Sequence, residues 1–324
     1  MAKQIIKRRG NKKNFMYELN GYFIKDKTTL AFINNLKIPP AWKDVEIAKN
    51  PNSKILCTGC DDAGRKQYIY HPQEIEKREK RKYDRMLVFV KSLPKIRRVT
   101  AQHLKRKKYD KQKVLATIVR IIDQAYFRAG NKKYAKENNS YGITTLRSRH
   151  LNIRDDSIIF NFEGKSGQKQ YKKIKDKQLA IILKQLDEMP GYEIFRYYSE
   201  DGELTNVSSK ELNDYLREIS DEDITAKDFR TWAGTLITAT ALSEIELTKD
   251  KKATKRHIAE AIKYTAQRLG NTPAITRSSY IDPRIINSFQ KGVTIGKILG
   301  TLKKAKPYLN KEEVCVLKLL EKTV

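Results

Sequence analysis

The chain has 324 residues, enough for two domains with substantial cores. Its 67 lysines and arginines against 38 aspartates and glutamates give a net charge of +29, which favours a polyanionic partner such as nucleic acid. No apolar run approaches the roughly 20 residues of a membrane span, and the N-terminus lacks the apolar stretch of a signal peptide, so we expect a soluble, intracellular protein without a membrane partner.

The first 75 residues show short, strand-like segments. Residues 1–13 are basic and polar, and we expect them to form a mobile arm. Strand patterns then follow over residues 15–22, 45–48, 55–58 and 67–70. Asp61-Asp62-Ala63-Gly64 predicts a turn before the last of them. The sequence therefore predicts a small β-rich N-terminal domain over residues 1–75.

Cys57 and Cys60 form a lone CxxC motif. A structural zinc ion needs four ligands, and no second cysteine pair or histidine lies at ligand spacing. We therefore expect no metal here, and interpret the motif as a tight turn that carries two ordinary thiols.

Residues 76–324 are predicted to form a larger, mainly α-helical domain. His71-Pro72 marks its start, and a helix over residues 74–90 leads to Pro94, which we expect to end it. Apolar residues recur at helical spacing from Val114 to Ile122. Strand patterns over residues 157–162 and 169–174 flank a short turn, which predicts a β-hairpin with Lys165 at its tip.

Helix-start signals mark the C-terminal half. Ser208 with Glu211 forms a capping box, and Thr225-Ala226-Lys227-Asp228 opens a second helix that carries Arg230. A final helix is expected over residues 311–322. Together with the N-terminal strands, this predicts an α+β fold.

The segment Leu269-Gly270-Asn271-Thr272-Pro273 predicts a sharp connection between two helices. Gly270 can end the first helix in the left-handed conformation, and Thr272-Pro273 can start the second as N-cap and first helical residue. Tyr280 then lies about two turns further on. Taken alone, Tyr280 is more simply a packed aromatic residue, but in so basic a chain it could attack a DNA phosphate.

Transfer of a phosphoryl group to a tyrosine needs fixed donors for the non-bridging oxygens and a proton for the leaving oxygen. Arg128 and Arg230 suit the first task, because a guanidinium group matches two phosphate oxygens and stays ionised. Lys165 suits the second, because it is placed on a flexible hairpin and the pKa of an amine can shift. This chemistry needs neither a metal nor a small-molecule cofactor.

In motif and order these residues resemble the type IB DNA topoisomerases, in the small branch shared by poxviruses, giant viruses and some bacteria. The resemblance runs from Ile38-Pro39-Pro40-Ala41-Trp42 to about Asp282-Pro283. Its most specific signals are Lys227-Asp228-Phe229-Arg230-Thr231-Trp232 and Leu269 to Pro273. It implies a catalytic domain of the tyrosine recombinase/topoisomerase IB type, with Arg128, Lys165, Arg230 and Tyr280 as catalytic residues.

The poxvirus enzymes have a histidine where this chain has Asn271, whereas the bacterial-like branch carries asparagine. An asparagine can donate a hydrogen bond but cannot carry a proton charge, so we expect Asn271 to stabilise the transition state only. The resemblance also implies a strand that touches the DNA major groove, and Gly64 to Tyr70 resembles it. The expected DNA contacts are Arg65, Lys66, Gln67, Tyr68, Tyr70, Lys133, Tyr134 and Lys227.

The resemblance implies an enzyme that relaxes positive and negative supercoils through a 3′-phosphotyrosyl intermediate, without ATP or metal. The enzyme would be a monomer that clamps double-stranded DNA, in a cytoplasmic viral factory or virion if it is viral and in the nucleoid if it is bacterial. One alternative is a tyrosine recombinase, but that family usually shows His-x-x-Arg where this chain has Lys227-x-x-Arg230. The other is a DNA-binding protein without enzymatic activity.

Simpler structural roles are open for single residues. Lys165 could be a solvated turn lysine, and Arg230 could form a salt bridge with Asp223 or Asp228. Tyr68 and Tyr70 lie on one face of a strand and could be a core pair instead of DNA contacts.

Overall fold

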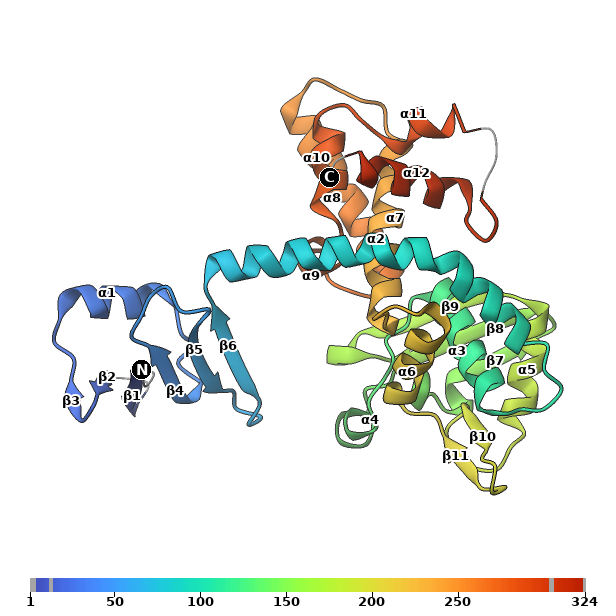
Figure 1. Cartoon of the computed structure of the whole chain (residues 1–324), viewed down its shortest axis with the longest axis horizontal. Coiled ribbons are helices and arrows are strands. Elements are labelled where there is room, and N and C mark those ends of the chain that lie inside the picture. Colours follow the sequence, from blue (N-terminus) through green and yellow to red (C-terminus); the bar gives the residue numbers. More distant parts are fainter. Residues whose placement is uncertain (1–3, 12–13, 303–305, 323–324) are drawn as a thin grey trace. The chain divides into compact units, whose positions relative to one another are not determined.

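The computed structural model describes residues 4–11, 14–302 and 306–322 (Figure 1). The chain forms two compact units, Met1–Asp84 and Arg85–Val324. Helix α2 (Pro72–His103) contributes to both, because the division falls between two of its residues. The first unit is built on a β-sheet and the second is mainly helical with smaller sheets, which confirms the predicted α+β class.

The first unit is organised around a six-stranded sheet with the order β3-β2-β1-β4-β5-β6, in which every neighbouring pair is antiparallel. Its elements are β1 (Ile5–Asn11), β2 (Asn14–Leu19), β3 (Tyr22–Phe23), α1 (Lys27–Asn35), β4 (Lys43–Ala48), β5 (Ile55–Cys60) and β6 (Lys66–Tyr70). Side chains from the sheet and from α1 form one apolar core that includes Ile6, Ile33 and Ile47. The four predicted strand segments are confirmed, whereas sequence patterning does not predict α1.

The prediction of a mobile arm over residues 1–13 is wrong where the structure describes this segment. Residues 5–11 form β1, which pairs with β2 on one side and with β4 on the other. Ile6 is fully buried, and Arg9 forms an ion pair with Glu18 of β2 at 2.8 Å. Strand pairing and one buried isoleucine thus order a segment whose charge suggests mobility. Residues 1–3, 12 and 13 lie outside the described residues.

The prediction of a tight turn at Cys57 and Cys60 is also wrong, because both residues lie on strand β5. The turn follows the strand, where the carboxylate of Asp61 accepts hydrogen bonds from the main-chain N–H groups of Ala63 (3.1 Å) and Arg65 (2.9 Å). Cys57 is buried in the core of the first unit, and burial raises the pKa of its thiol to about 11. Cys57 therefore packs as a small apolar residue.

The second unit holds the remaining helices and two small sheets. Its α-helices after α2 are α3 (Lys111–Ala125), α4 (Lys132–Asn138), α5 (Lys177–Asp187), α6 (Ser209–Ser220), α7 (Ala226–Ser243), α8 (Lys251–Leu269), α9 (Pro273–Tyr280), α10 (Pro283–Gln290), α11 (Ile295–Leu299) and α12 (Lys311–Glu321). Its strands are β7 (Leu151–Arg154), β8 (Ser157–Glu163) and β9 (Lys169–Lys175) in one sheet, and β10 (Arg196–Tyr198) and β11 (Leu204–Asn206) in the other. The predicted hairpin is confirmed as β8–β9, and the capping boxes at Ser208 and Thr225 are both formed.

The predicted helix end at Pro94 is wrong, because Pro94 lies inside α2. Proline removes one main-chain donor and usually kinks or breaks a helix. Here the helix continues because residues on both sides of the proline, including Phe89, Leu93 and Ile96, are fully buried in the core. Burial of this apolar face outweighs the lost hydrogen bond.

Helix α7 lies at the centre of the second unit, in contact with α3, α6 and every α-helix from α8 to α12 (Figure 1). A partly buried ionic network fixes its surroundings. Arg97 of α2 binds Asp123 of α3 (2.7 Å) and Glu313 of α12 (2.8 Å), and Trp232 of α7 donates to Glu313 at 3.4 Å. Burial alone would lower the pKa of Arg97, but its bonds to the two carboxylates raise it above the ordinary value. This network ties α12 to the helix that carries Arg230.

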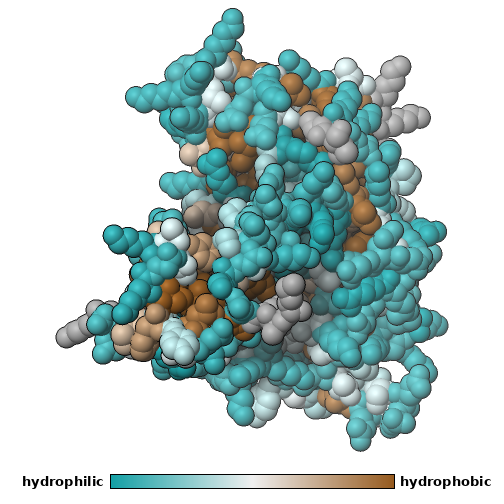
Figure 2. Space-filling model, turned by 60° about the vertical axis from the view of Figure 1, so that its left-hand side comes forward, coloured by the Kyte–Doolittle hydropathy of each residue, from teal (hydrophilic) through white to brown (hydrophobic). Residues whose placement is uncertain are grey.

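Hydrophilic residues cover most of the face drawn in Figure 2, with apolar residues visible between them. None of the helices in the described part of the chain has the length and apolar character needed to cross a membrane.

Candidate active site

Tyr280 is positioned by the predicted connection between two helices. Gly270 ends α8 with φ +61°, and its N–H group bonds back to the carbonyls of Ala266 and Gln267. Thr272 caps α9 by accepting from the N–H group of Ile275, and Pro273 is the first helical residue. The predicted helix end at Gly270 and the predicted helix start at Thr272-Pro273 are both confirmed. Tyr280 is the last residue of α9, with 9% of its surface exposed.

Helix α7 fixes the main chain of Tyr280 from the other side. A Cβ atom on Gly234 would lie only 2.4 Å from the carbonyl oxygen of Tyr280, so the contact requires glycine at this position. The hydroxyl of Thr235 donates to that carbonyl (3.4 Å) and accepts from the N–H group of Asp282 (3.0 Å). The ring packs in a small cluster with Ala233 and Leu269. The tyrosine is thus rigidly seated between α7 and α8.

Arg230 lies directly beside this ring, on the first turns of α7. Its Cζ atom is 5.1 Å from the centroid of the Tyr280 ring, and the residue is only 2% exposed. One terminal nitrogen donates to the carbonyl of Tyr126 and the other to the carbonyl of Leu269, at 3.0 Å for the second. Burial and the nearby charge of Arg128 lower the pKa of Arg230 from its ordinary value.

The salt bridge of Arg230 with Asp223 or Asp228, which the sequence leaves open, is not formed. Asp223 and Asp228 both pair with Arg85, at 3.1 and 3.0 Å, and Asp228 also caps α7. Arg230 interacts with two carbonyl groups and with the phenol of Tyr280, and among the described residues it forms no ion pair with a carboxylate. Such a buried cation is costly unless an anion joins it.

Arg128 and Asn271 meet beside the same tyrosine, although 143 residues separate them in the sequence. Arg128 follows α3, and its carbonyl accepts from the N–H group of Ile143 at 2.8 Å. Its guanidinium group donates to Oδ1 of Asn271 at 2.5 Å. That bond directs the amide nitrogen of Asn271 away from Arg128.

Several buried polar atoms around Tyr280 lack a partner in the described structure. They are Nδ2 of Asn271, Nε of Arg230 and Oγ1 of Thr276. Buried polar groups in folded proteins are almost always hydrogen-bonded, so a cluster of unpaired donors indicates a ligand site. The donor set suits a group with several oxygens and negative charge, such as a phosphate.

The same charges act on the phenol of Tyr280. Burial raises its pKa, but the positive charges of Arg230 and Arg128 outweigh burial and lower the pKa below the ordinary value of a tyrosine. A phenol that ionises more easily is a better nucleophile at neutral pH. The site therefore combines an activated hydroxyl with cations placed to receive an anion.

Lys165 is placed as the sequence predicts, in a short turn (Lys165–Gly167) at the tip of the β8–β9 hairpin. Its side chain is exposed, and in the described structure it has no hydrogen bond or ion pair with the other four candidate residues. The hairpin itself does reach the site, because Gln170 of β9 donates to the carbonyl of Gly270 at 3.4 Å. The structure thus brings four predicted residues together and leaves Lys165 on an adjoining, solvent-exposed tip.

The predicted DNA contacts lie on the surface of each unit. In the first unit, Tyr68 and Tyr70 project from β6 with stacked rings (centroids 5.8 Å apart), while Ile69 between them packs towards the core. Tyr68 is 43% exposed, so this pair is not part of the core. In the same strand region Arg65 and Lys66 are exposed and Gln67 is half-buried. The side chains of Arg65 and Gln67 both donate to the carboxylate of Asp61. In the second unit Lys133, Tyr134 and Lys227 are exposed.

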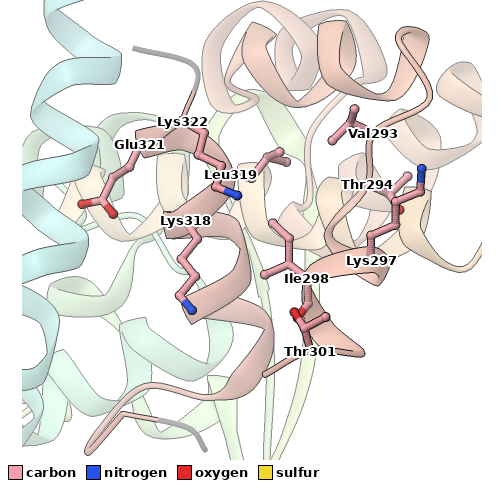
Figure 3. A pocket seen from close by; sticks show the side chains of 9 residues that line it. All are labelled: Val293, Thr294, Lys297, Ile298, Thr301, Lys318, Leu319, Glu321 and Lys322. Atoms are coloured by element: carbon pink, nitrogen blue, oxygen red, sulfur yellow. The ribbon is translucent and has the colours of Figure 1, made fainter. Parts of the chain in front are cut away.

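A pocket of about 640 Å³ lies elsewhere in the second unit, around α11 and α12 (Figure 3). Its lining residues are Val293, Thr294, Lys297, Ile298, Thr301, Lys318, Leu319, Glu321 and Lys322. None of them is a predicted catalytic residue, so the reactive centre is not formed by this pocket.

Sequence reasoning did not identify two residues that border the site, Gln170 and Lys172 of β9. Both point inward from the strand and bond to carbonyl groups at the end of α8. Their period-2 alternation with Tyr171 and Lys173 is the signal that could have revealed them, since it places polar residues on the buried face of a predicted strand.

Comparison with known proteins agrees with this geometry. Residues 66–306 match the family model described as eukaryotic DNA topoisomerase I, catalytic core, and residues 14–61 match that of the bacterial DNA topoisomerase IB N-terminal domain. The chain is 37% identical over 256 residues to DNA topoisomerase 1B of Acanthamoeba polyphaga mimivirus, covering 77% of this chain and 76% of the relative. It is 26% identical to DNA topoisomerase I of monkeypox virus, covering 81% and 82% of the two chains.

Proposed function

The chain belongs to the type IB DNA topoisomerases, and from this premise we propose which of its residues cut and reseal DNA. The observation that carries the proposal is the convergence of Arg128, Arg230 and Asn271 on Tyr280, with unpaired buried donors among them. The partner is DNA. Tyr280 is the nucleophile, and the three neighbouring side chains bind the phosphate that it attacks.

In the cleavage step the hydroxyl of Tyr280 loses its proton to solvent and the oxygen attacks the phosphorus. The bond from phosphorus to the 5′ oxygen breaks, which leaves a 3′-phosphotyrosyl ester and a 5′ strand end. Arg128 and Arg230 neutralise the charge that develops on the non-bridging oxygens, and Nδ2 of Asn271 donates one further hydrogen bond. Lys165 gives its proton to the leaving 5′ oxygen when the hairpin tip reaches the bond.

After cleavage the downstream duplex rotates, driven by torque in the DNA. The 5′ hydroxyl then attacks the phosphorus of the phosphotyrosyl ester, and Lys165 takes back the proton. The bond from phosphorus to the Tyr280 oxygen breaks, the phenol regains its proton from solvent, and the nick is sealed. Because the ester keeps the energy of the broken bond, the cycle needs no nucleotide hydrolysis. Positive and negative supercoils are both relaxed.

Both units contribute DNA contacts in this proposal. Residues 1–75 form the N-terminal DNA-binding domain and residues 76–324 the catalytic domain, and one copy of the chain is sufficient. The stacked pair Tyr68 and Tyr70 and the basic residues beside it contact the major groove, while Lys133, Tyr134 and Lys227 contact phosphates. These lysine contacts predict binding that weakens steeply with salt.

The proposal is tested by plasmid relaxation in EDTA without ATP. We expect complete relaxation of positively and negatively supercoiled plasmids, through a ladder of topoisomers, because every group in the proposed reaction belongs to the protein or the DNA. A strict requirement for a divalent metal or for ATP would contradict the proposed mechanism. Products that are recombined instead of relaxed would favour the recombinase alternative.

The role of Asn271 predicts a specific pH dependence. Because an amide does not titrate, position 271 should add no step near pH ~6.5 to the cleavage rate of the wild-type protein. Asn271→His should introduce a step below that pH, because the charges of Arg128 and Arg230 disfavour a third cation and lower the imidazole pKa. Single-turnover cleavage between pH 5 and 9 measures both. A step in the wild type that Asn271→Ala abolishes would refute this role.

A further inference from the structure

Strand β9 places polar side chains where a buried face usually carries apolar ones. Residues 170, 172 and 174 point inward, and Ile174 is buried as expected for such a position. Gln170, however, is only 4% exposed and Lys172 is half-buried. A buried polar group destabilises the fold unless it is hydrogen-bonded. The hydrogen-bond partners of Gln170 and Lys172 therefore indicate the role of these two residues.

Both side chains bond to the C-terminal end of α8. Lys172 donates to the carbonyl of Arg268, and Gln170 donates to the carbonyl of Gly270 at 3.4 Å. The carbonyl between them, that of Leu269, accepts from Arg230 at 3.0 Å. The last carbonyls of a helix have no partner within the helix and carry its negative partial charge, which favours cations such as Lys172 and Arg230.

The contact between β9 and the end of α8 is tight. A Cβ atom on Gly270 would lie 2.3 Å from the amide nitrogen of Gln170, so any side chain at position 270 would have to displace the Gln170 amide. The next residue along the loop is Asn271. Burial, followed by the charges of Arg268 and Arg230, lowers the pKa of Lys172 to about 8, which places its amine in the same electrostatic environment as Arg230.

We propose that Gln170 and Lys172 are positioning residues, which fix the β8–β9 hairpin to the end of α8 so that Lys165 is presented to the phosphate held by Arg230 and Asn271. This inference rests on the proposed role of Lys165 as proton donor. The hairpin tip is exposed and, within the described residues, forms no bond of its own to the site, so its placement depends on the strand that leads to it. A displacement of about 1 Å is enough to slow a positioned reaction strongly.

The test compares Gln170→Ala and Lys172→Met with Lys165→Ala on two DNA substrates. In the first, the 5′ leaving atom is the natural oxygen, and in the second it is sulfur, whose thiol pKa of about 8.5 allows it to leave without a proton. In single-turnover cleavage at saturating protein, we expect about tenfold slower reaction for both positioning variants on the oxygen substrate. On the sulfur substrate we expect wild-type rates for both, as for Lys165→Ala.

Two controls separate positioning from loss of charge or of folding. Lys173→Met removes the same charge from the outward face of β9 and should leave both rates within twofold, and Lys172→Arg, which keeps a cationic donor, should restore most of the oxygen rate. A defect of Gln170→Ala and Lys172→Met that persists on sulfur, while that of Lys165→Ala disappears, overturns this inference alone. Normal rates of both variants on oxygen overturn it as well. If Lys165→Ala itself is not restored by sulfur, the assignment of Lys165 as proton donor fails.

Discussion

Tyr280→Phe is expected to abolish both DNA relaxation and the covalent protein–DNA adduct, a loss of at least about 10⁴-fold. The substitution removes one oxygen atom and keeps the ring, which packs with Ala233 and Leu269 and lies beside the guanidinium group of Arg230. The fold and the phosphate-binding side chains should therefore be retained. Denaturing electrophoresis of protein mixed with labelled DNA measures the adduct, and plasmid relaxation measures turnover.

The matched control is Tyr192→Phe, which removes the same atom from a tyrosine that is 80% exposed. It should leave adduct formation and relaxation unchanged. DNA binding by Tyr280→Phe at fixed salt should stay within about twofold of wild type, because the phosphate contacts are carried by other residues. An adduct of normal yield in Tyr280→Phe would show that another residue is the nucleophile.

The local features of this site follow from local sequence signals. Gly270 at a helix end and Thr272-Pro273 at the next helix start are fixed by main-chain geometry, which depends on the nearest residues only. The β8–β9 hairpin is similarly local, since its strands are separated by a short turn. These elements were therefore predictable without knowledge of the rest of the fold.

The errors have a common physical origin in tertiary packing. Residues 5–11 look like a charged arm, but pairing with two strands orders them, and Pro94 looks like a helix end, but burial of its neighbours continues α2. In both cases long-range contacts outweigh a local preference. The bond between Arg128 and Asn271 is also a long-range contact, because these residues are 143 positions apart in the sequence and no local pattern predicts that they meet.

Arg230→Lys is expected to slow cleavage by about 10²- to 10³-fold although it keeps the positive charge. The guanidinium group has two tasks in the proposed site: it binds main-chain carbonyls and it binds the phosphate. Its terminal nitrogens donate to the carbonyls of Tyr126 and Leu269, while Nε has no partner in the described structure. A single ammonium group cannot reproduce this fork, so it will satisfy either the carbonyls or the phosphate. The loss corresponds to about 3–4 kcal/mol of transition-state stabilisation.

Because Arg230 acts on the non-bridging oxygens, its variant should differ from the Lys165 variant in its response to a sulfur leaving atom. Cleavage and resealing share one transition state, so Arg230→Lys should slow both steps similarly and leave the cleavage equilibrium nearly unchanged. Replacing the 5′ leaving oxygen by sulfur should not restore the rate, because no proton transfer is at fault. Arg217→Lys, at an exposed arginine that pairs with Asp214 and Asp223, is the control and should leave the cleavage and resealing rates unchanged. A near-normal rate in Arg230→Lys would mean that the fork does not contact the reacting phosphate.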